Sequence, residues 1–174
     1  GKSRDQGYAL TAGGCRCGHP PSSFAPFATR SFPDGSPGLP PRQEGEYLTA
    51  READEAIGFL ERAGRRAAFL FYAPYAVHSP IQAPFDVIER FQGKPTTNHD
   101  QPAYAAMIAE LDDAVGRILA ALDRLGRLEY SLLVFSSDHG GARHFPATDN
   151  APPREGQGLP HEGGLRGPRS RRWR

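Results

Sequence analysis

The 174-residue sequence lacks any hydrophobic run near the ~20 residues that a membrane-spanning helix requires. Its first residues also lack the basic-then-apolar pattern of a secretory signal. The formal net charge is only +1, so no excess of positive charge indicates a nucleic-acid partner. We therefore expect neither a membrane nor a nucleic acid as partner, and these features identify neither a compartment nor an oligomeric state.

Lysine and cysteine are both scarce. Lys2 and Lys94 are the two lysines, and the other basic residues are arginines. Cys15 and Cys17 stand too close together for an easy mutual disulfide, and no second pair completes a structural zinc site. We interpret these cysteines and the neighbouring His19 as incidental rather than as metal ligands.

Proline and glycine are concentrated in one segment, residues 18–45. Such a mixture excludes a helix or a central strand, so the pattern predicts an irregular segment that wraps the rest of the domain. Directly afterwards, Thr49 is followed three residues later by Glu52, the spacing of a capping box. An amphipathic helix is predicted over residues 49–64.

Two short apolar segments, residues 67–73 and 132–136, read as buried strands. Between them the sequence predicts a short helix near 84–92 and a long helix over 102–126, whose apolar stripe ends at a glycine. This alternation indicates an α/β protein. We expect the two strands to be neighbours in one sheet, with the long helix against its face.

Polar residues follow both predicted strands, where ligands bind in open α/β sheets. His78 follows the first strand, and Asp138 and His139 follow the second. Taken alone, His78 fits a surface or capping histidine, and Asp138 fits a helix N-cap. The arginine-rich end, residues 169–174, is typical of a disordered tail.

Six segments follow one another along the chain: YLTAREADEAIGFLE, FLFYAPYAVHSPIQAP, YAAMIAELDDAVGRILAALDRLG, LLVFSSDHGG, TDNAPPREGQG and HEGGLRGP. In this order and spacing they resemble successive blocks of the arylsulfatase-like sulfatases, from about residue 13 to residue 168. The resemblance implies the alkaline-phosphatase-like fold, a mixed α/β sheet flanked by helices. Residues 1–168 would then be a carboxyl-side part of the catalytic domain, incomplete on the amino-terminal side.

The resemblance also implies hydrolysis of a sulfate ester on a small molecule or a glycan. Such sulfatases use a formylglycine, made within a C-x-P-x-R motif, and a calcium ion that binds the sulfate oxygens. His78 matches the family histidine that contacts the sulfate and the leaving oxygen, so it is the candidate general acid. Asp138 matches a metal-binding aspartate, a hard ligand suited to calcium.

The sequence departs from the family pattern at three points. His139 stands where the family has asparagine, and Gln157 stands where it has a lysine that would contact sulfate. No C-x-P-x-R motif occurs, so formylglycine is not encoded here. We expect calcium binding to be weak or lost, and these 174 residues to be inactive alone.

Two other readings stay open: a non-catalytic sulfatase remnant that binds metal or anions at most, and a phosphoester or phosphonate hydrolase of the same superfamily. If the inherited site survives, His78, Asp138 and Gln157 should converge on one cleft.

Overall fold

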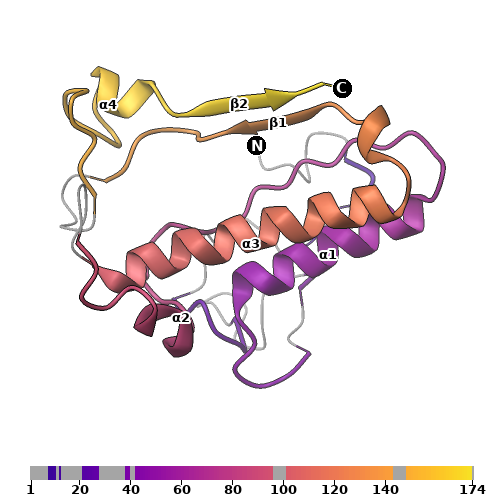
Figure 1. The fold of residues 1–174 in the computed structure, drawn as a ribbon, viewed down its shortest axis with the longest axis horizontal. Helices are drawn as coiled ribbons and strands as arrows, with labels where there is room; N and C mark the ends of the chain where they lie inside the picture. The colour runs from indigo at the N-terminus through magenta and orange to yellow at the C-terminus, as the bar shows by residue number, and fades with distance from the viewer. Residues whose placement is uncertain are drawn as a thin grey trace.

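The computed structural model of the chain describes residues 8–10, 12, 21–27, 38–39, 42–95, 101–142 and 148–173. Its first three helices form one layer, and a two-stranded ribbon crosses above that layer in the view of Figure 1, with the last helix beside the ribbon. The elements in chain order are α1 (Leu48–Ala63), α2 (Phe85–Glu89), α3 (Pro102–Arg124), the 3-10 turn η2 (Leu128–Tyr130), β1 (Leu133–Ser136), α4 (Glu162–Leu165) and β2 (Arg169–Arg172).

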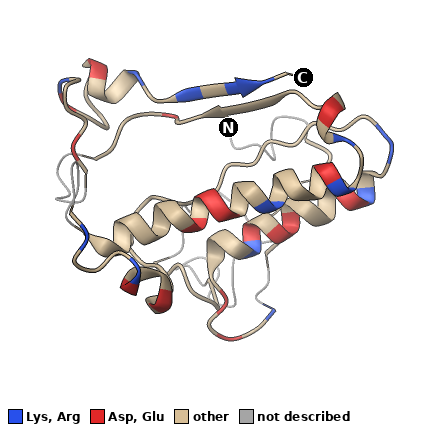
Figure 2. Ribbon diagram, in the orientation of Figure 1, with Lys and Arg blue, Asp and Glu red and all other residues tan. Residues whose placement is uncertain are grey.

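Helices α1 and α3 lie side by side and share the main apolar core (Figure 1). Its buried members, spaced three to four residues apart on each helix, are Ala53, Ala56, Leu60, Ala114, Ile118 and Leu122. Ion pairs of Arg117 with Asp54 and of Arg124 with Glu61 join the helices outside this core. Figure 2 shows both signs of charge mixed along this pair. The two amphipathic helices predicted from the sequence are thereby confirmed.

No helix in the described ranges combines the length and apolar content needed to cross a membrane.

The described parts of the Pro/Gly-rich segment contact the start of α1. Phe27 and Leu39 are almost fully buried and form a small cluster with Leu48. The N–H of Leu48 donates to the carbonyl of Ser23 at 2.8 Å. This segment therefore contributes side chains to the core although it forms no helix in its described part.

The capping box predicted at the start of α1 is wrong. The N-cap is Tyr47, and no side chain caps the helix. Thr49 lies inside the first turn and is buried. The Glu52 carboxylate instead accepts the N–H of Tyr75 at 3.4 Å. The Glu52 carboxylate, which a capping box would have used at the helix end, therefore binds the segment around Tyr75 instead.

Residues 67–73 do not form the predicted strand, which was expected to be buried on both faces. Leu70 and Tyr72 pack against the α1–α3 core, but Phe69 and Phe71 remain 73% and 58% exposed. This alternation is typical of an extended segment with one covered face. The prediction fails because, among the described residues, no neighbouring strand pairs with it.

Strand β1 pairs with β2 rather than with residues 67–73. The pairing is antiparallel and runs from Leu133 opposite Arg172 to Ser136 opposite Arg169. The tail expected to be disordered is therefore a strand over Arg169–Arg172. Pairing uses backbone groups alone, and the arginine side chains stay exposed, so no charge is buried.

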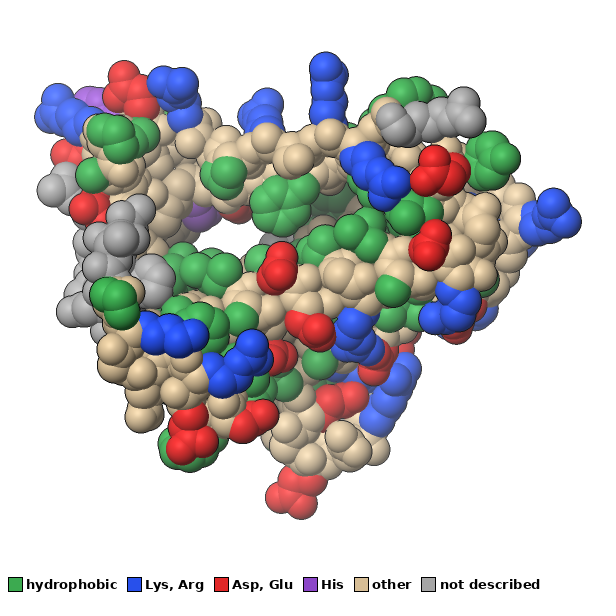
Figure 3. All heavy atoms as spheres, viewed as in Figure 1, with side chains coloured by type: hydrophobic (Ala, Val, Ile, Leu, Met, Phe, Trp, Pro, Cys, Tyr) green, Lys and Arg blue, Asp and Glu red, His purple; other side chains and the backbone are tan. Residues whose placement is uncertain are grey.

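The sheet leaves apolar side chains uncovered. Val134 and Phe135 are 69% and 49% exposed, whereas Leu133 packs against the α1–α3 core. Figure 3 shows hydrophobic side chains beside a hollow between the ribbon and α3. Both segments predicted as neighbouring strands thus lie over the same helical pair without pairing with each other.

Two glycines offer a matched test of backbone conformation. Gly126, just after α3, has φ +64°, whereas Gly116 lies inside α3, and a Cβ at either position would meet nothing within 4 Å. We expect Gly126→Ala to lower the free energy of unfolding by about 1 kcal/mol, because L-residues disfavour positive φ. Gly116→Ala should raise it by about 0.4–1 kcal/mol. Urea unfolding measures both, and changes of the same sign would contradict this account.

Candidate functional site

His78 lies in the loop that follows residues 67–75. Its N–H donates to the Tyr75 carbonyl at 2.9 Å, and its ring Nδ1 lies 2.8 Å from the Ser79 carbonyl oxygen. A carbonyl oxygen only accepts, so Nδ1 carries a proton. In the neutral ring, Nε2 is then the nitrogen that takes up a proton, which gives His78 the chemistry of a general acid or base.

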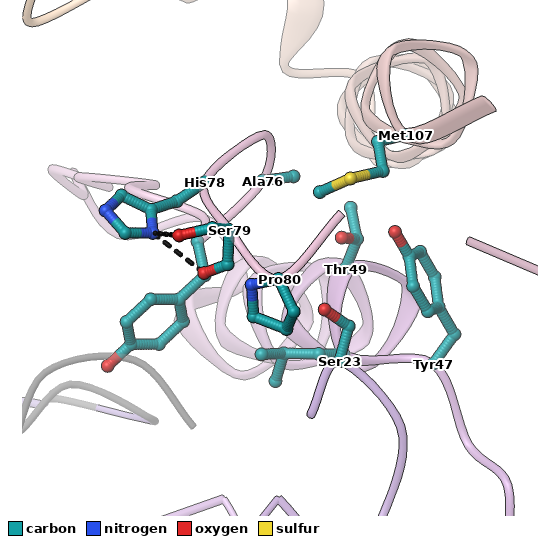
Figure 4. A pocket seen from close by; sticks show the side chains of 10 residues that line it. Ser23, Tyr47, Thr49, Ala76, His78, Ser79, Pro80 and Met107 are labelled. Atoms are coloured by element: carbon teal, nitrogen blue, oxygen red, sulfur yellow. Dashed lines mark hydrogen bonds between the residues drawn. The ribbon is translucent and has the colours of Figure 1, made fainter. Parts of the chain in front are cut away.

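A narrow pocket opens beside His78. Its walls come from the start of α1, from α3 and from the loop itself, and they include Tyr47, Thr49 and Met107 (Figure 4). In that view the imidazole lies on the far side of the loop from Met107. The pocket volume is about 10 Å³, room for about one water molecule. A sulfate ester does not fit inside it, so any substrate would approach His78 from outside the pocket.

Asp138 and His139 occupy the loop directly after β1. One carboxylate oxygen of Asp138 accepts the N–H of His139 at 2.9 Å, and the other lies 3.3 Å from the ring Nε2 of His139. The Asp138 side chain is 84% exposed. The carboxylate therefore faces its neighbouring histidine at the surface rather than a buried cage of oxygen ligands.

Gln157 is brought to this same loop by its backbone. Its N–H donates to the Gly141 carbonyl at 3.1 Å. Asn150 reinforces the junction: its side-chain oxygen accepts the Gly141 N–H, and its amide donates to the carbonyls of Gly141 and Glu155, at 2.9, 2.9 and 3.1 Å. Sequence reasoning missed Asn150, because its partners are known only once the two loops are placed together.

Gly140 lies where the loop after β1 meets helix α4, and only glycine fits there. A Cβ built there would lie 1.6 Å from the carbonyl oxygen of Gly163, which leaves no space for a side chain. Gly140 thus allows backbone to approach backbone closely.

The structure brings Asp138, His139 and Gln157 into one pair of adjoining loops. Neither Asp138 nor Gln157 belongs to the described residues that line the pocket of His78. The convergence of His78, Asp138 and Gln157 on one cleft therefore stays a prediction.

The described residues do not fit a calcium ion. Within these ranges, no group of three or more His, Cys, Asp or Glu side chains is placed to hold a metal. Calcium takes 6–8 oxygen ligands, whereas this loop offers the carboxylate of Asp138 beside an imidazole.

A partly buried carboxyl group, that of Glu52, lies near the same pocket. Glu52 sits beneath residues 72–75, and burial raises its pKa to about 8, against a smaller lowering by the Tyr75 N–H. Desolvation likewise raises the pKa of Tyr47 to about 12. Glu52 falls four residues before the buried Ala56 and eight before the buried Leu60, so the sequence already placed it on the same face of the helix as these two residues.

Comparison with known proteins gives the family. The sequence matches the sulfatase family over residues 8–169. A sulfatase of Formosa agariphila is 33% identical over 135 residues, which are 71% of this chain and 24% of that protein. Steryl-sulfatase of Mus musculus is 38% identical over 133 residues, covering 72% of this chain and 20% of that protein. The chain thus spans about a fifth to a quarter of these relatives.

Solved structures agree with this match. Ps i-CgsB in complex with k-i-k-neocarrahexaose has a TM-score of 0.69 at 30% identity, over 79% of this chain and 30% of that chain. A second structure of Ps i-CgsB has a TM-score of 0.70, also at 30% identity. The fold is a partial α/β domain of the alkaline-phosphatase-like class, as predicted. Since the family match extends over nearly the whole sequence, the chain belongs to the sulfatase family.

Proposed function

We propose that this chain belongs to a sulfate-ester hydrolase and contributes the residue that protonates the leaving group. The nucleophile is absent from these 174 residues. The observation that carries the proposal is the sulfatase match over residues 8–169, which includes His78 and Asp138. Family membership supports sulfate-ester hydrolysis, and the roles of individual residues in this chain are our inference.

The proposed role of His78 follows from its ring geometry. Cleavage of the bond between sulfur and the ester oxygen leaves an alkoxide or phenoxide, which needs a proton. With Nδ1–H turned to the Ser79 carbonyl, a protonated His78 gives that proton from Nε2. The ring is exposed, so an ester bound outside the narrow pocket has access to it.

We propose a sulfated small molecule or glycan as the substrate class. Ps i-CgsB, whose structure resembles this chain, was crystallised with a neocarrahexaose. Asp138 and Gln157 would lie at the sulfate end, with Gln157 donating a hydrogen bond in place of a cation.

A second candidate function is a non-catalytic remnant that binds anions or metal at most. Three observations favour it. Asp138 is largely exposed, and the described residues offer no group of three metal-binding side chains. Gln157 also supplies no positive charge where sulfate charge would develop.

The coding DNA on the 5′ side of this sequence separates the two candidates. A C-x-P-x-R motif in the same reading frame supports the hydrolase, and the longer chain should then hydrolyse an aryl sulfate. In that longer chain, His78→Ala should lower kcat by about 10²–10⁴-fold, the usual contribution of a general acid. A reading frame without the motif would support the remnant. An active longer chain that tolerates His78→Ala would refute the role given to His78.

A further inference from the structure

His78 belongs to a tight turn whose first residue is Tyr75. The N–H of His78 donates to the Tyr75 carbonyl at 2.9 Å and closes this turn. At the base of the turn, the N–H of Tyr75 donates to the carboxyl group of Glu52, on α1, at 3.4 Å. Both backbone groups of Tyr75 are therefore engaged, one by α1 and the other by His78. Glu52 is thus linked to His78 through the backbone of a single residue.

The far end of the loop that carries His78 is also fixed by hydrogen bonds. The Gln82 carbonyl accepts the hydroxyl of Tyr47 at 3.0 Å, and the Gln82 side-chain oxygen accepts the N–H of Ser23 at 2.8 Å. His78 therefore lies between two fixed points, Gln82 on one side and the bond to Glu52 on the other. The bond to Glu52 is the nearer of the two along the chain.

The state of the His78 ring depends on this turn. Its Nδ1 lies 2.8 Å from the carbonyl oxygen of Ser79, as the dashed line in Figure 4 shows. That bond holds the proton on Nδ1 and leaves Nε2 as the atom that takes up or gives a proton. If the turn relaxes, the ring loses its fixed acceptor and the proton redistributes between the two nitrogens. The tautomer of His78 therefore reports whether the turn is held.

The surroundings of Glu52 favour a lasting hydrogen bond. Burial raises the pKa of Glu52 to about 8, so the carboxyl group is largely uncharged at neutral pH. Tyr47, Tyr72 and Tyr75 lie close enough to interact electrostatically with it. Water competes weakly for the carboxyl oxygen in such a poorly solvated place, so the bond to the Tyr75 N–H is stronger than it would be at the surface.

We propose that Glu52 is a positioning residue, whose carboxyl group holds the turn at Tyr75 and thereby keeps Nε2 of His78 available for proton transfer. This role rests on the general-acid function proposed for His78. Glu52 acts through the Tyr75 backbone and exchanges no proton with the ester. Glutamine at position 52 should serve equally well, because a neutral carboxyl group and a carboxamide both offer an acceptor oxygen. An apolar side chain of similar size should not.

The tautomer of His78 tests this proposal in the 174-residue chain. Nitrogen NMR of the imidazole distinguishes the Nδ1–H form of the neutral ring from the Nε2–H form. Wild type and Glu52→Gln should show mainly the Nδ1–H form. Glu52→Met has no acceptor oxygen, so it should lower the ratio of Nδ1–H to Nε2–H by about 2- to 10-fold, the range that one net hydrogen bond represents. Glu61→Met, the same substitution near the other end of α1, should leave the ratio unchanged.

Three results would overturn the proposal: a wild-type ring that is mainly Nε2–H, a Glu52→Met chain that keeps the wild-type ratio, or an equal loss in Glu61→Met. Hydrogen exchange at the Tyr75 amide is a second measurement that does not depend on the methionine variants. It should be slow in wild type and in Glu52→Gln, and fast exchange there would contradict the proposed bond. Neither readout uses activity, so both are separate from the His78→Ala assay of the general acid.

Discussion

Replacing Glu52 by glutamine should stabilise the fold above neutral pH and remove much of its pH dependence. In the folded chain, burial raises the Glu52 pKa from 4.5 to about 8. Below about pH 4.5, the carboxyl is protonated in both the folded and the unfolded chain, so its contribution to stability is fully present. As pH rises from about 4.5 to about 8, the unfolded chain ionises first and the free energy of unfolding falls.

The expected size of this effect is on the order of 3–5 kcal/mol at pH 8 and above, from the free energy that one pKa unit represents. Glutamine keeps an oxygen that can accept the Tyr75 N–H, and it has no charge to desolvate. The difference between variant and wild type should therefore be small at pH 4.5 and large at pH 8.5.

Urea unfolding at a series of pH values measures this difference. Glu44→Gln, an exposed glutamate just before α1, is the matched control and should follow the wild-type profile. If Glu52→Gln and wild type lose stability in parallel between pH 4.5 and 8.5, the carboxyl of Glu52 is not desolvated as the structure indicates.

The 174-residue chain by itself should not hydrolyse sulfate esters above background. A sulfatase needs a nucleophile in line with sulfur, and this sequence contains no C-x-P-x-R motif in which formylglycine forms. Loss of an activated nucleophile lowers the rate by several orders of magnitude even when other groups remain. Here Gln157 also brings no charge to the sulfate, and Asp138 faces solvent.

The assay is release of a chromogenic phenol from an aryl sulfate, with and without added calcium. A His78→Ala chain, purified identically, is the control. Turnover that His78→Ala abolishes would refute the prediction and show that these residues suffice for catalysis. Turnover equal in both chains would come from a contaminating enzyme and would leave the expected inactivity standing.

Local patterns in the sequence determined α1 and α3. Their apolar residues recur every three to four positions, and this period depends only on helix geometry. Gly126 also marked the end of α3 correctly, because its positive φ is a local property of the backbone. The family was likewise accessible from the order of the motifs, since each motif is a short contiguous segment.

The site was predictable only in part. The sequence pointed to His78 and Asp138 as polar residues after apolar segments, and the structure adds which neighbour each one contacts. Asn150 gave no such signal. Its three hydrogen bonds go to Gly141 and Glu155, and the link to Gly141 spans nine residues across two loops.

Strand pairing and burial were decided by tertiary structure alone. A strand needs a partner that is distant in sequence, so the apolar run 67–73 stays unpaired while the arginine-rich Arg169–Arg172 pairs with β1. Glu52 shows the same dependence, since its acceptor role at Tyr75 joins residues 23 positions apart. Helical periodicity is encoded within a few turns of chain, whereas hydrogen-bond ladders and desolvated charges arise from contacts that only the folded arrangement creates.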